Sequence, residues 1–428
     1  MVSHTEPVII AARRTPIGTR GRALSHLRVE ELAAPVIVAA LGDARAAVSA
    51  ASLSTASLST ASSSPAELPP AALSADGVST RIASDRGAAG PTEQPHRARP
   101  DELYIADVIL GNCMGPGGNP ARVAALAAGL GVHTPGETVD RQCGSGLAAI
   151  LDAVSAIRAG DSRPRIAGGV ESASTAPVRS MAGIAYDRAP FAPVGFPDPD
   201  MVRAAEDLAA ANGISRARQD AHAARSHARA LAARDAGRFR DELVSLAGLE
   251  ADDAIGGAAA ILGRLPSLFP GGSLTAGTST RIGDGAAATV VVPRALAGGA
   301  PGLILRGHAV VGCDPALPGI GAAPAILAAL EHADVPLARI TGIEIVEAFA
   351  AQSLAVLDRI GVDEDDPRVC ADGGALALGH PWGASGAVGI VRLFSRLVRG
   401  GAPSGTLGIA AASIGGGMGV AAVVEVVR

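Results

Sequence analysis

Thr138-Val-Asp-Arg-Gln-Cys-Gly-Ser-Gly-Leu-Ala-Ala-Ile150 is the stretch that decides the fold of this chain. It predicts the end of a strand, a sharp turn and then a helix. Gly144 and Gly146 allow the tight turn, and apolar residues then recur at helical spacing as far as Gly160. Cys143 is therefore expected at or next to a helix N-terminus. The free N–H groups and the positive dipole end of a helix favour a thiolate over a thiol at such a place.

Cys143 has two interpretations on this pattern alone. A thiolate on a strained turn, flanked by residues too small to block an approaching carbonyl carbon, is a suitable acyl acceptor. A buried structural cysteine is the alternative, and it is among the commonest fates of a free cysteine. The stretch by itself leaves both interpretations open.

The composition excludes several classes of protein. The 428 residues carry a net charge of −5 and only 2% are aromatic, so the chain offers neither a basic field nor a stacking platform for nucleic acid. No lysine is present, which excludes a Schiff-base lysine. Although 48% of the residues are hydrophobic, no uninterrupted apolar run reaches the ~20 residues of a membrane span.

The cysteines and the first 20 residues suggest a reducing cytoplasm. Four cysteines in so long a chain do not make a disulfide framework, and no Cys/His spacing resembles a zinc site, so we expect no bound metal. Residues 1–20 lack the charge order of a signal peptide, because Arg13 and Arg14 follow the short apolar run instead of preceding it.

Strands and helices are expected to alternate along most of the chain. The patterns predict strands at residues 7–12, 103–110, 166–172, 286–292, 303–311, 340–346 and 406–412, and helices at 29–40, 201–211, 215–235 and 387–398. A further helix should start at Asn119, as its cap, with Pro120 in the first position. Residues 46–100 repeat Ala-Ser-Leu-Ser-Thr and are rich in Ala, Ser and Pro. They predict a disordered surface insertion, with a partner-binding segment as the alternative.

The last part of the chain repeats the first at low resolution. Residues 138–172 and residues 373–417 share the order turn, helix, strand and glycines. Two similar α/β halves would bring their glycine-rich turns close together. Residues 173–280 differ from both halves and predict an inserted lid-like subdomain.

Six motifs, in this order, resemble the thiolase family: Asp140-Arg-Gln-Cys-Gly-Ser-Gly146, Gly168-Gly-Val-Glu-Ser172, Gly213-Ile-Ser-Arg-Ala-Arg-Gln-Asp220, Thr275-Ala-Gly277, Gly373-Gly-Ala-Leu-Ala-Leu-Gly-His-Pro-Trp-Gly-Ala-Ser-Gly386 and Gly415-Gly-Gly-Met-Gly419. The resemblance implies an α/β fold with two similar βαβ-type halves stacked in five layers (αβαβα). The first half would be residues 1–172 with about 281–295, the loop domain 173–280, and the second half 296–428.

The resemblance also implies an activity and assigns residues to it. Members condense two acetyl-CoA molecules or cleave a 3-ketoacyl-CoA with free CoA in fatty acid and lipid metabolism, without a prosthetic group, usually as homodimers or homotetramers. Cys143 matches the nucleophile and His380 the histidine that activates it and helps to hold the thioester oxygen. The amides of Cys143 and Gly415 match an oxyanion hole. The remaining assignments are substrate or oxyanion binding for Glu347, and the CoA tunnel for Phe269 and Thr280.

The chain departs from the family pattern at positions that serve carbon–carbon chemistry. Ser413 replaces a second cysteine that moves the proton at the substrate α-carbon, and a hydroxyl is a poor proton shuttle without a strong base beside it. Val346 replaces an asparagine that holds a water molecule. Pro318 and Val178 replace a methionine and a histidine near the acyl pocket. Acyl transfer onto Cys143 should survive these changes, whereas the steps that handle the carbanion are weakened.

The primary hypothesis is therefore a thiolase-type acyl-CoA C-acyltransferase. One alternative is an acyltransferase or thioesterase that stops at acyl-Cys143. A second is a non-catalytic subunit that binds acyl-CoA. A decarboxylating ketoacyl synthase also uses a cysteine nucleophile with a histidine. This hypothesis ranks below the others, because the runs at 168–172 and 213–220 are more similar to thiolases.

Overall fold

The computed structural model describes residues 6–60, 103–186, 188–256 and 261–428. The first helix, α1, covers Val29–Thr60, so the prediction of disorder was wrong for residues 46–60. Alanine is the strongest helix former and dominates residues 46–51, and the Ser52 hydroxyl donates back to Val48 O at 3.0 Å. The predicted insertion beyond residue 60, up to 100, lies outside the described residues.

One continuous mixed sheet runs through both halves of the molecule. Its strand order is β10-β11-β12-β9-β1-β8-β5-β3-β4, with β2 beside β8. The halves join where β1 pairs with β9 at Val8–Ile304 and Ile9–Leu303. The strands are β1 Pro7–Arg14, β2 Gly18–Thr19, β3 Asp107–Gly111, β4 Gly136–Val139, β5 Arg165–Ser172, β8 Gly283–Pro293, β9 Gly302–Gly312, β10 Ile340–Ile345, β11 Leu407–Ile414 and β12 Met418–Val427.

Helices cover both faces of each half of this sheet. Helices α3 (Ser145–Arg158) and α10 (Trp382–Leu393) share one core with strands of both halves. On the outer faces, α1 and α2 (Pro120–Ala127) cover the first half, and α7 (Ala322–Ala333) lies against the second. Successive residues of β1 point to opposite faces of the sheet. Val8 faces the core under α1, and Ile9 faces the core that α3 and α10 share. The helix–sheet–helix–sheet–helix order confirms the predicted five layers.

A close backbone contact fixes the central helices against each other. The carbonyl oxygen of Gly383, in the first turn of α10, faces three glycines of the other half. A Cβ atom would come within 2.0 Å of this oxygen at Gly169, 2.5 Å at Gly111 and 2.8 Å at Gly146. Real Cβ contacts are not that short, so only glycine fits at these positions. We call this arrangement the Gly383 contact.

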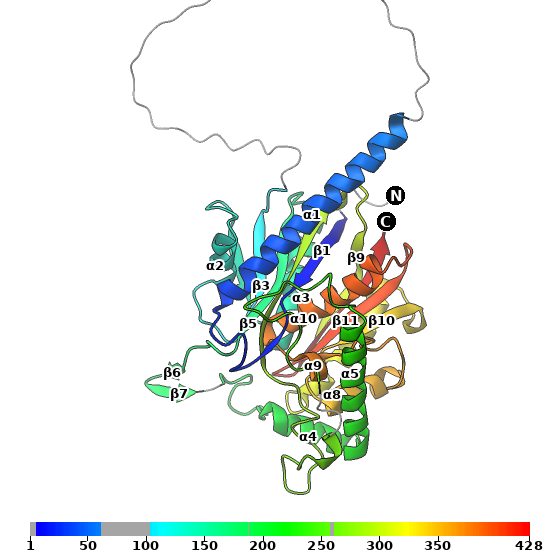
Figure 1. Ribbon diagram of the computed structural model, residues 1–428. Helices are drawn as coiled ribbons and strands as arrows, with labels where there is room; N and C mark the ends of the chain where they lie inside the picture. Colours follow the sequence, from blue (N-terminus) through cyan, green and yellow to red (C-terminus); the bar gives the residue numbers. More distant parts are fainter. Residues whose placement is uncertain (1–5, 61–102, 187, 257–260) are drawn as a thin grey trace, which may run out of the picture.

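Residues 173–280 form loops, helices and one pair of short strands, and their helices α4 and α5 lie in the lower part of the view in Figure 1. Asp200 caps α4 (Met201–Ala211), and Ser215 caps α5 (Arg216–Asp235) as predicted. The structure does not test the exact domain boundaries, which stay predictions. The other elements are β6 Arg179–Met181, β7 Ile184–Tyr186, α6 Arg294–Ala297, α8 Ala350–Ile360, α9 Ala375–Leu378, the short 3₁₀ turns Gln142–Gly144, Leu262–Arg264, Pro318–Ile320 and Leu337–Arg339, and the π-helical turn Phe394–Arg399.

Buried charges tie this loop region to both halves. Arg14 of β1 pairs with Glu242 at 2.7 Å and with Asp252 at 2.6 Å, and Arg392 of α10 also pairs with Glu242. The side chains of all four residues are almost completely buried, with at most 2% exposed. Removing one partner from such a buried cluster is costly, so the loop region is expected to unfold together with the core.

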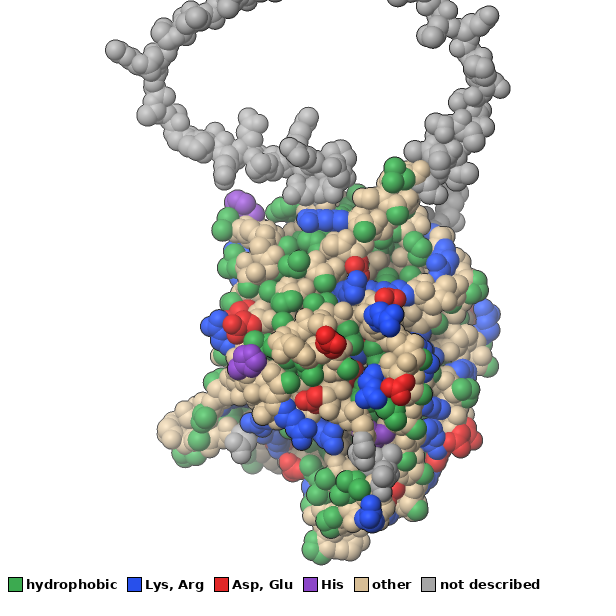
Figure 2. All heavy atoms as spheres, viewed as in Figure 1, with side chains coloured by type: hydrophobic (Ala, Val, Ile, Leu, Met, Phe, Trp, Pro, Cys, Tyr) green, Lys and Arg blue, Asp and Glu red, His purple; other side chains and the backbone are tan. Residues whose placement is uncertain are grey.

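On the surface, Figure 2 shows basic and acidic side chains intermixed over one face.

Helix α1 extends beyond the body of the molecule in Figure 1. By length and composition, its residues 29–53 would suffice to cross a membrane. The side chains of Val29, Leu32, Val36 and Ile37 are nevertheless buried against the sheet. The N-terminal part of α1 is therefore a core helix of the first half.

Candidate active site

The nucleophile turn forms as the sequence predicts. Residues 142–144 make one 3₁₀ turn, and α3 begins directly after it at Ser145. The Ser145 hydroxyl accepts from Arg141 N–H at 2.7 Å and donates to Gln142 O at 2.6 Å. Gln142 has a φ of 45°, in the left-handed region, so the residue before Cys143 carries backbone strain. This strained turn holds Cys143 at the start of the helix.

His380 reaches the same point from the second half. It follows α9, where Gly379 has a φ of 107°. The His380 Nε2 atom lies 3.3 Å from the Cys143 sulfur. The hydrogen-bond distance makes His380 a suitable general base for the thiol.

Ser385 sets the tautomer of His380, a role that the sequence analysis missed. Its hydroxyl lies 2.6 Å from His380 Nδ1 and donates to Pro381 O at 2.9 Å. Because a hydroxyl has one hydrogen, and Pro381 O takes it, the Ser385 oxygen accepts from Nδ1–H. The Nε2 atom is then unprotonated and faces the Cys143 thiol. The signal was the serine five residues after His380, in the first turns of α10, which begins two residues after His380.

The expected thiolate at Cys143 is wrong for the resting structure. Burial raises the pKa of the Cys143 thiol to about 12, although the backbone N–H groups of Cys143 and Gly415 lower it. Burial also lowers the pKa of His380 to about 4. The loss of hydration therefore outweighs the helix dipole. The resting pair is therefore a neutral thiol beside a neutral imidazole.

A cavity of about 590 Å³ opens onto this pair. Small-molecule sites usually measure ~300–1,000 Å³. Of the predicted site residues, the structure brings together around this cavity Cys143, His380, Ser413, Gly415 and Thr280. Most other lining side chains are apolar, and Phe191 packs directly on Gly415, where an added Cβ would lie 2.7 Å from its ring. The cavity can therefore take an apolar acyl group next to the Gly415 amide.

Comparison with known proteins identifies the family. The chain matches the family model of the thiolase N-terminal domain over residues 96–295 and that of the thiolase C-terminal domain over residues 301–426. The chain belongs to the thiolase family. The crystal structure of the Bacillus anthracis acetyl-CoA acetyltransferase covers 99% of this chain and 99% of its own, with a TM-score of 0.76 and 32% sequence identity.

Other known proteins are more similar to this chain in sequence. The putative acetyl-CoA C-acetyltransferase YhfS of Bacillus subtilis is 42% identical over 76% of this chain and 88% of its own length. The acetyl-CoA acetyltransferase of Pseudomonas aeruginosa is 40% identical over 75% of this chain and 88% of its own length. That of Escherichia coli is 38% identical over 81% and 94%. These similarities confirm the resemblance that the six motifs suggested.

Two predicted binding residues lie away from the cavity lining. Glu347 is buried and pairs with His222 at 3.3 Å, and the Ser226 hydroxyl donates to it at 2.6 Å. Although burial opposes ionisation, these partners hold the pKa of Glu347 below its ordinary value. Phe269 lies under the guanidinium of Arg203, 5.2 Å from the ring centroid. Neither contact points to a substrate, so Glu347 ties α5 to the second half, and the CoA-tunnel role of Phe269 stays a prediction.

Ser413, which the resemblance places at the position of the family's second cysteine, is held by groups that are not bases. Its hydroxyl donates to Gly319 O at 2.6 Å and accepts from Ala322 N–H at 3.0 Å and from Gln352 Nε2 at 3.4 Å. A backbone carbonyl or an amide does not raise the reactivity of a hydroxyl as an imidazole or carboxylate would. Ser413 therefore lines the cavity as a fixed polar group.

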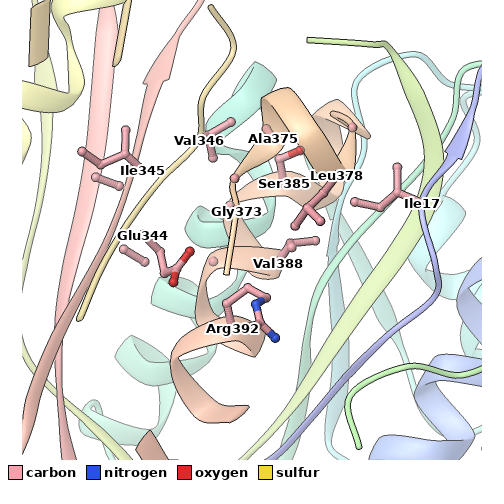
Figure 3. A pocket seen from close by; sticks show the side chains of 16 residues that line it. Ile17, Glu344, Ile345, Val346, Gly373, Ala375, Leu378, Ser385, Val388 and Arg392 are labelled. Carbon is pink, nitrogen blue, oxygen red and sulfur yellow. The ribbon is translucent and has the colours of Figure 1, made fainter. Parts of the chain in front are cut away.

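Val346 faces a separate, smaller cavity instead of the substrate cavity. This space of about 30 Å³ is lined by Val346 and Ser385 at one end and by Glu344 and Arg392 at the other, as Figure 3 shows. Val346 is 8% exposed and packs in the central core. The valine thus gives this cavity an apolar lining, and its inability to hold a water molecule stays a prediction.

Proposed function

We propose that this protein transfers an acyl group from acyl-CoA to Cys143 and then to the α-carbon of a second acyl-CoA. This is the acetyl-CoA C-acetyltransferase reaction, or in reverse the 3-ketoacyl-CoA thiolase reaction. The observation that carries the proposal is the 3.3 Å contact between His380 Nε2 and the Cys143 sulfur beside the Gly415 turn. The acetyl-CoA acetyltransferases among the relatives support the same substrate class.

The first half-reaction follows from the geometry of the neutral pair. The Cys143 sulfur attacks the thioester carbon while its proton moves to His380 Nε2, and the carbonyl oxygen becomes an oxyanion. The backbone N–H groups of Cys143 and Gly415 act on the Cys143 sulfur, since both lower its pKa, and would stabilise the developing charge beside it. Collapse of the intermediate breaks the carbon–sulfur bond to CoA. The CoA sulfur takes the proton from His380, which leaves acyl-Cys143 and a neutral imidazole.

The second half-reaction is the weaker one in this chain. A base must remove the α-proton of the second thioester so that the carbanion can attack acyl-Cys143 and release the Cys143 sulfur. Ser413 stands at the expected position, but its hydrogen bonds come from backbone and amide groups. The second candidate function is therefore acyl transfer or thioester hydrolysis that stops at acyl-Cys143, and the Ser413 contacts favour it.

Mass spectrometry of the intact protein with acetyl-CoA tests both candidates. An acetyl adduct, together with exchange of the α-protons in deuterium oxide, supports the complete reaction. An adduct without exchange supports the second candidate. If no acyl-CoA gives an adduct, the enzymatic proposal is refuted and a binding role remains.

Ser413→Cys is expected to accelerate α-proton exchange by roughly 10²–10⁴-fold, the usual contribution of an efficient acid–base group. A thiol is much more acidic than a hydroxyl and can move the proton. The rate is measured from the uptake of deuterium by acetyl-CoA in deuterium oxide. Ser413→Ala serves as the control and should leave the formation of acyl-Cys143 almost unchanged. Equal exchange rates in wild type and Ser413→Cys would show that another group moves the proton.

Ser385→Ala is expected to slow the formation of acyl-Cys143 about tenfold, the value of one hydrogen bond of ~1.4 kcal/mol. The variant loses the oxygen that holds His380 in the tautomer with a free Nε2. Stopped-flow measurement of CoA release gives the rate. Ser155→Ala is a matched control, because that hydroxyl only donates to Leu151 O on α3. An unchanged rate in Ser385→Ala would remove Ser385 from the mechanism.

We also propose that the protein works in the cytoplasm, in lipid metabolism, as a homodimer or homotetramer. All four cysteines are free, which suits a reducing compartment. Light scattering on the purified protein would give its oligomeric state.

A further inference from the structure

Glu171 is a buried carboxylate that the mechanism above does not use. It lies near the end of β5 and is 0% exposed. Four N–H groups donate to it. Its Oε1 accepts from Asn112 Nδ2 at 3.0 Å and from Met114 N–H at 3.1 Å, and its Oε2 accepts from Cys113 N–H at 3.1 Å and from Gly383 N–H at 2.9 Å. Such a complete set of partners satisfies a buried carboxylate.

These donors belong to the two segments that hold the catalytic pair. Residues 112–114 follow β3 and brace the nucleophile turn, because the Cys113 thiol donates to Gln142 O at 3.2 Å. The same thiol lies 3.5 Å from the Ser145 hydroxyl. Gly383 follows His380 by three residues and starts α10 together with Trp382. One carboxylate thus bridges the Cys143 side and the His380 side of the site.

We propose that Glu171 is a positioning residue for acyl transfer, whose carboxylate holds the loop that braces Cys143 and the segment that carries His380 in register. The inference rests on the proposed function, because it assigns Glu171 a part in the same reaction. A carboxylate at the N-terminus of α10 also suits the positive end of the helix dipole. The alternative is a carboxylate that stabilises the fold without any effect on the reacting pair.

The negative charge of Glu171 also reaches the nucleophile. It raises the pKa of Cys143 and of Cys113, with a smaller contribution from Asp140, while burial is the largest cause for both thiols. Burial raises the pKa of Glu171 itself to about 7. All four of its hydrogen bonds are donated to it, so a proton on either oxygen would displace one of them. Among the described residues, the titratable groups whose pKa Glu171 raises are these two thiols, and the Cys113 thiol in turn lowers the pKa of Glu171.

Wild-type protein gives the first test without any substitution. If the ionised carboxylate is needed, acylation of Cys143 should fall at least about tenfold between pH ~8.5 and ~5.5, with a midpoint near 7. Protonation of His380 cannot cause this fall in the acylation rate, because the pKa of His380 is about 4. An acylation rate that stays level over this range would overturn the requirement for ionised Glu171.

Glu171→Gln provides the second test, with two readouts. We expect acylation by acetyl-CoA to fall by about 10–100-fold and to lose its dependence on pH near 7. The second readout is alkylation of Cys143 by iodoacetamide as a function of pH. Removal of the negative charge should shift its midpoint to lower pH, so that the thiol becomes more reactive towards iodoacetamide while acyl transfer becomes slower. A purely structural carboxylate predicts no such opposite changes.

Glu206→Gln is the matched control. Glu206 is another buried carboxylate that accepts from backbone N–H groups, those of Ser273 and Leu274, but in the loop region. It should leave the alkylation midpoint unchanged. Acylation of Glu171→Gln within twofold of wild type, or an alkylation midpoint equal to that of the control, would refute the proposal. The alkylation readout needs no acyl-CoA, so it stands even if the proposed function fails because wild-type protein forms no adduct.

Discussion

Cys143→Ala is expected to abolish acylation of the protein by acetyl-CoA, with a loss of rate on the order of 10⁶, as for removal of the nucleophile in other covalent enzymes. The structure places one nucleophilic sulfur next to His380 and the Gly415 amide, and without it no acyl group can be held there. The intact mass should show an adduct on wild-type protein and none on the variant.

Cys313→Ala is the control for this experiment. Cys313 lies just after β9 and hydrogen-bonds through its backbone to Gly417 O at 2.7 Å, so its thiol has no part in the proposed reaction. The Cys313→Ala variant should be acylated like wild-type protein. An adduct that persists in Cys143→Ala would show that another residue carries the acyl group, and it would contradict the mechanism.

His380→Ala is expected to slow acylation by roughly 10²–10⁴-fold near neutral pH. The Cys143 thiol has a pKa of about 12 and needs a base within reach as it attacks. Without the imidazole only the small thiolate fraction reacts, so the residual rate should rise about tenfold per pH unit. Wild type should show no such rise above neutral pH, because its neutral imidazole takes the proton.

His332→Ala tests whether the effect is specific to His380. His332 is exposed at the end of α7, and its ring contacts only His308 O among the hydrogen bonds of the described residues. It should react at the wild-type rate with the wild-type dependence on pH. If His380→Ala kept the shallow wild-type dependence, His380 would not be the base.

Local signals in the sequence predicted the elements that position the site. The Cys143 turn, the Asn119 cap and the Ser215 cap form where short-range rules place them. The start of α10 was predicted too late, at residue 387, because Gly383 and Gly386 suggested a turn. In the structure the helix begins at Trp382, since close packing against α3 admits only small residues there.

The ionisation of the site could not be predicted in this way. A helix N-terminus is visible in a sequence, but the burial that raises the pKa of Cys143 depends on segments hundreds of residues apart. The same holds for Glu171, whose partners at residues 112–114 and at Gly383 become neighbours only when the two halves pack together. For Glu347 the sequence predicted too much. The family motif suggested a binding role, whereas the structure shows Glu347 in contact with His222 and Ser226 of α5.

The Gly383 contact limits how this enzyme can be re-engineered. In most proteins, the spacing of two catalytic groups depends on side chains that can be exchanged for others of similar volume. Here the spacing is set where backbone meets backbone, with no side chain between Gly383 and Gly169. Enlarging the substrate cavity through Phe191 or Met201 should therefore change which acyl groups enter without changing the distance from Cys143 to His380. A single methyl group at Gly169 should instead change the distance from Cys143 to His380 and leave the lining of the substrate cavity as it is.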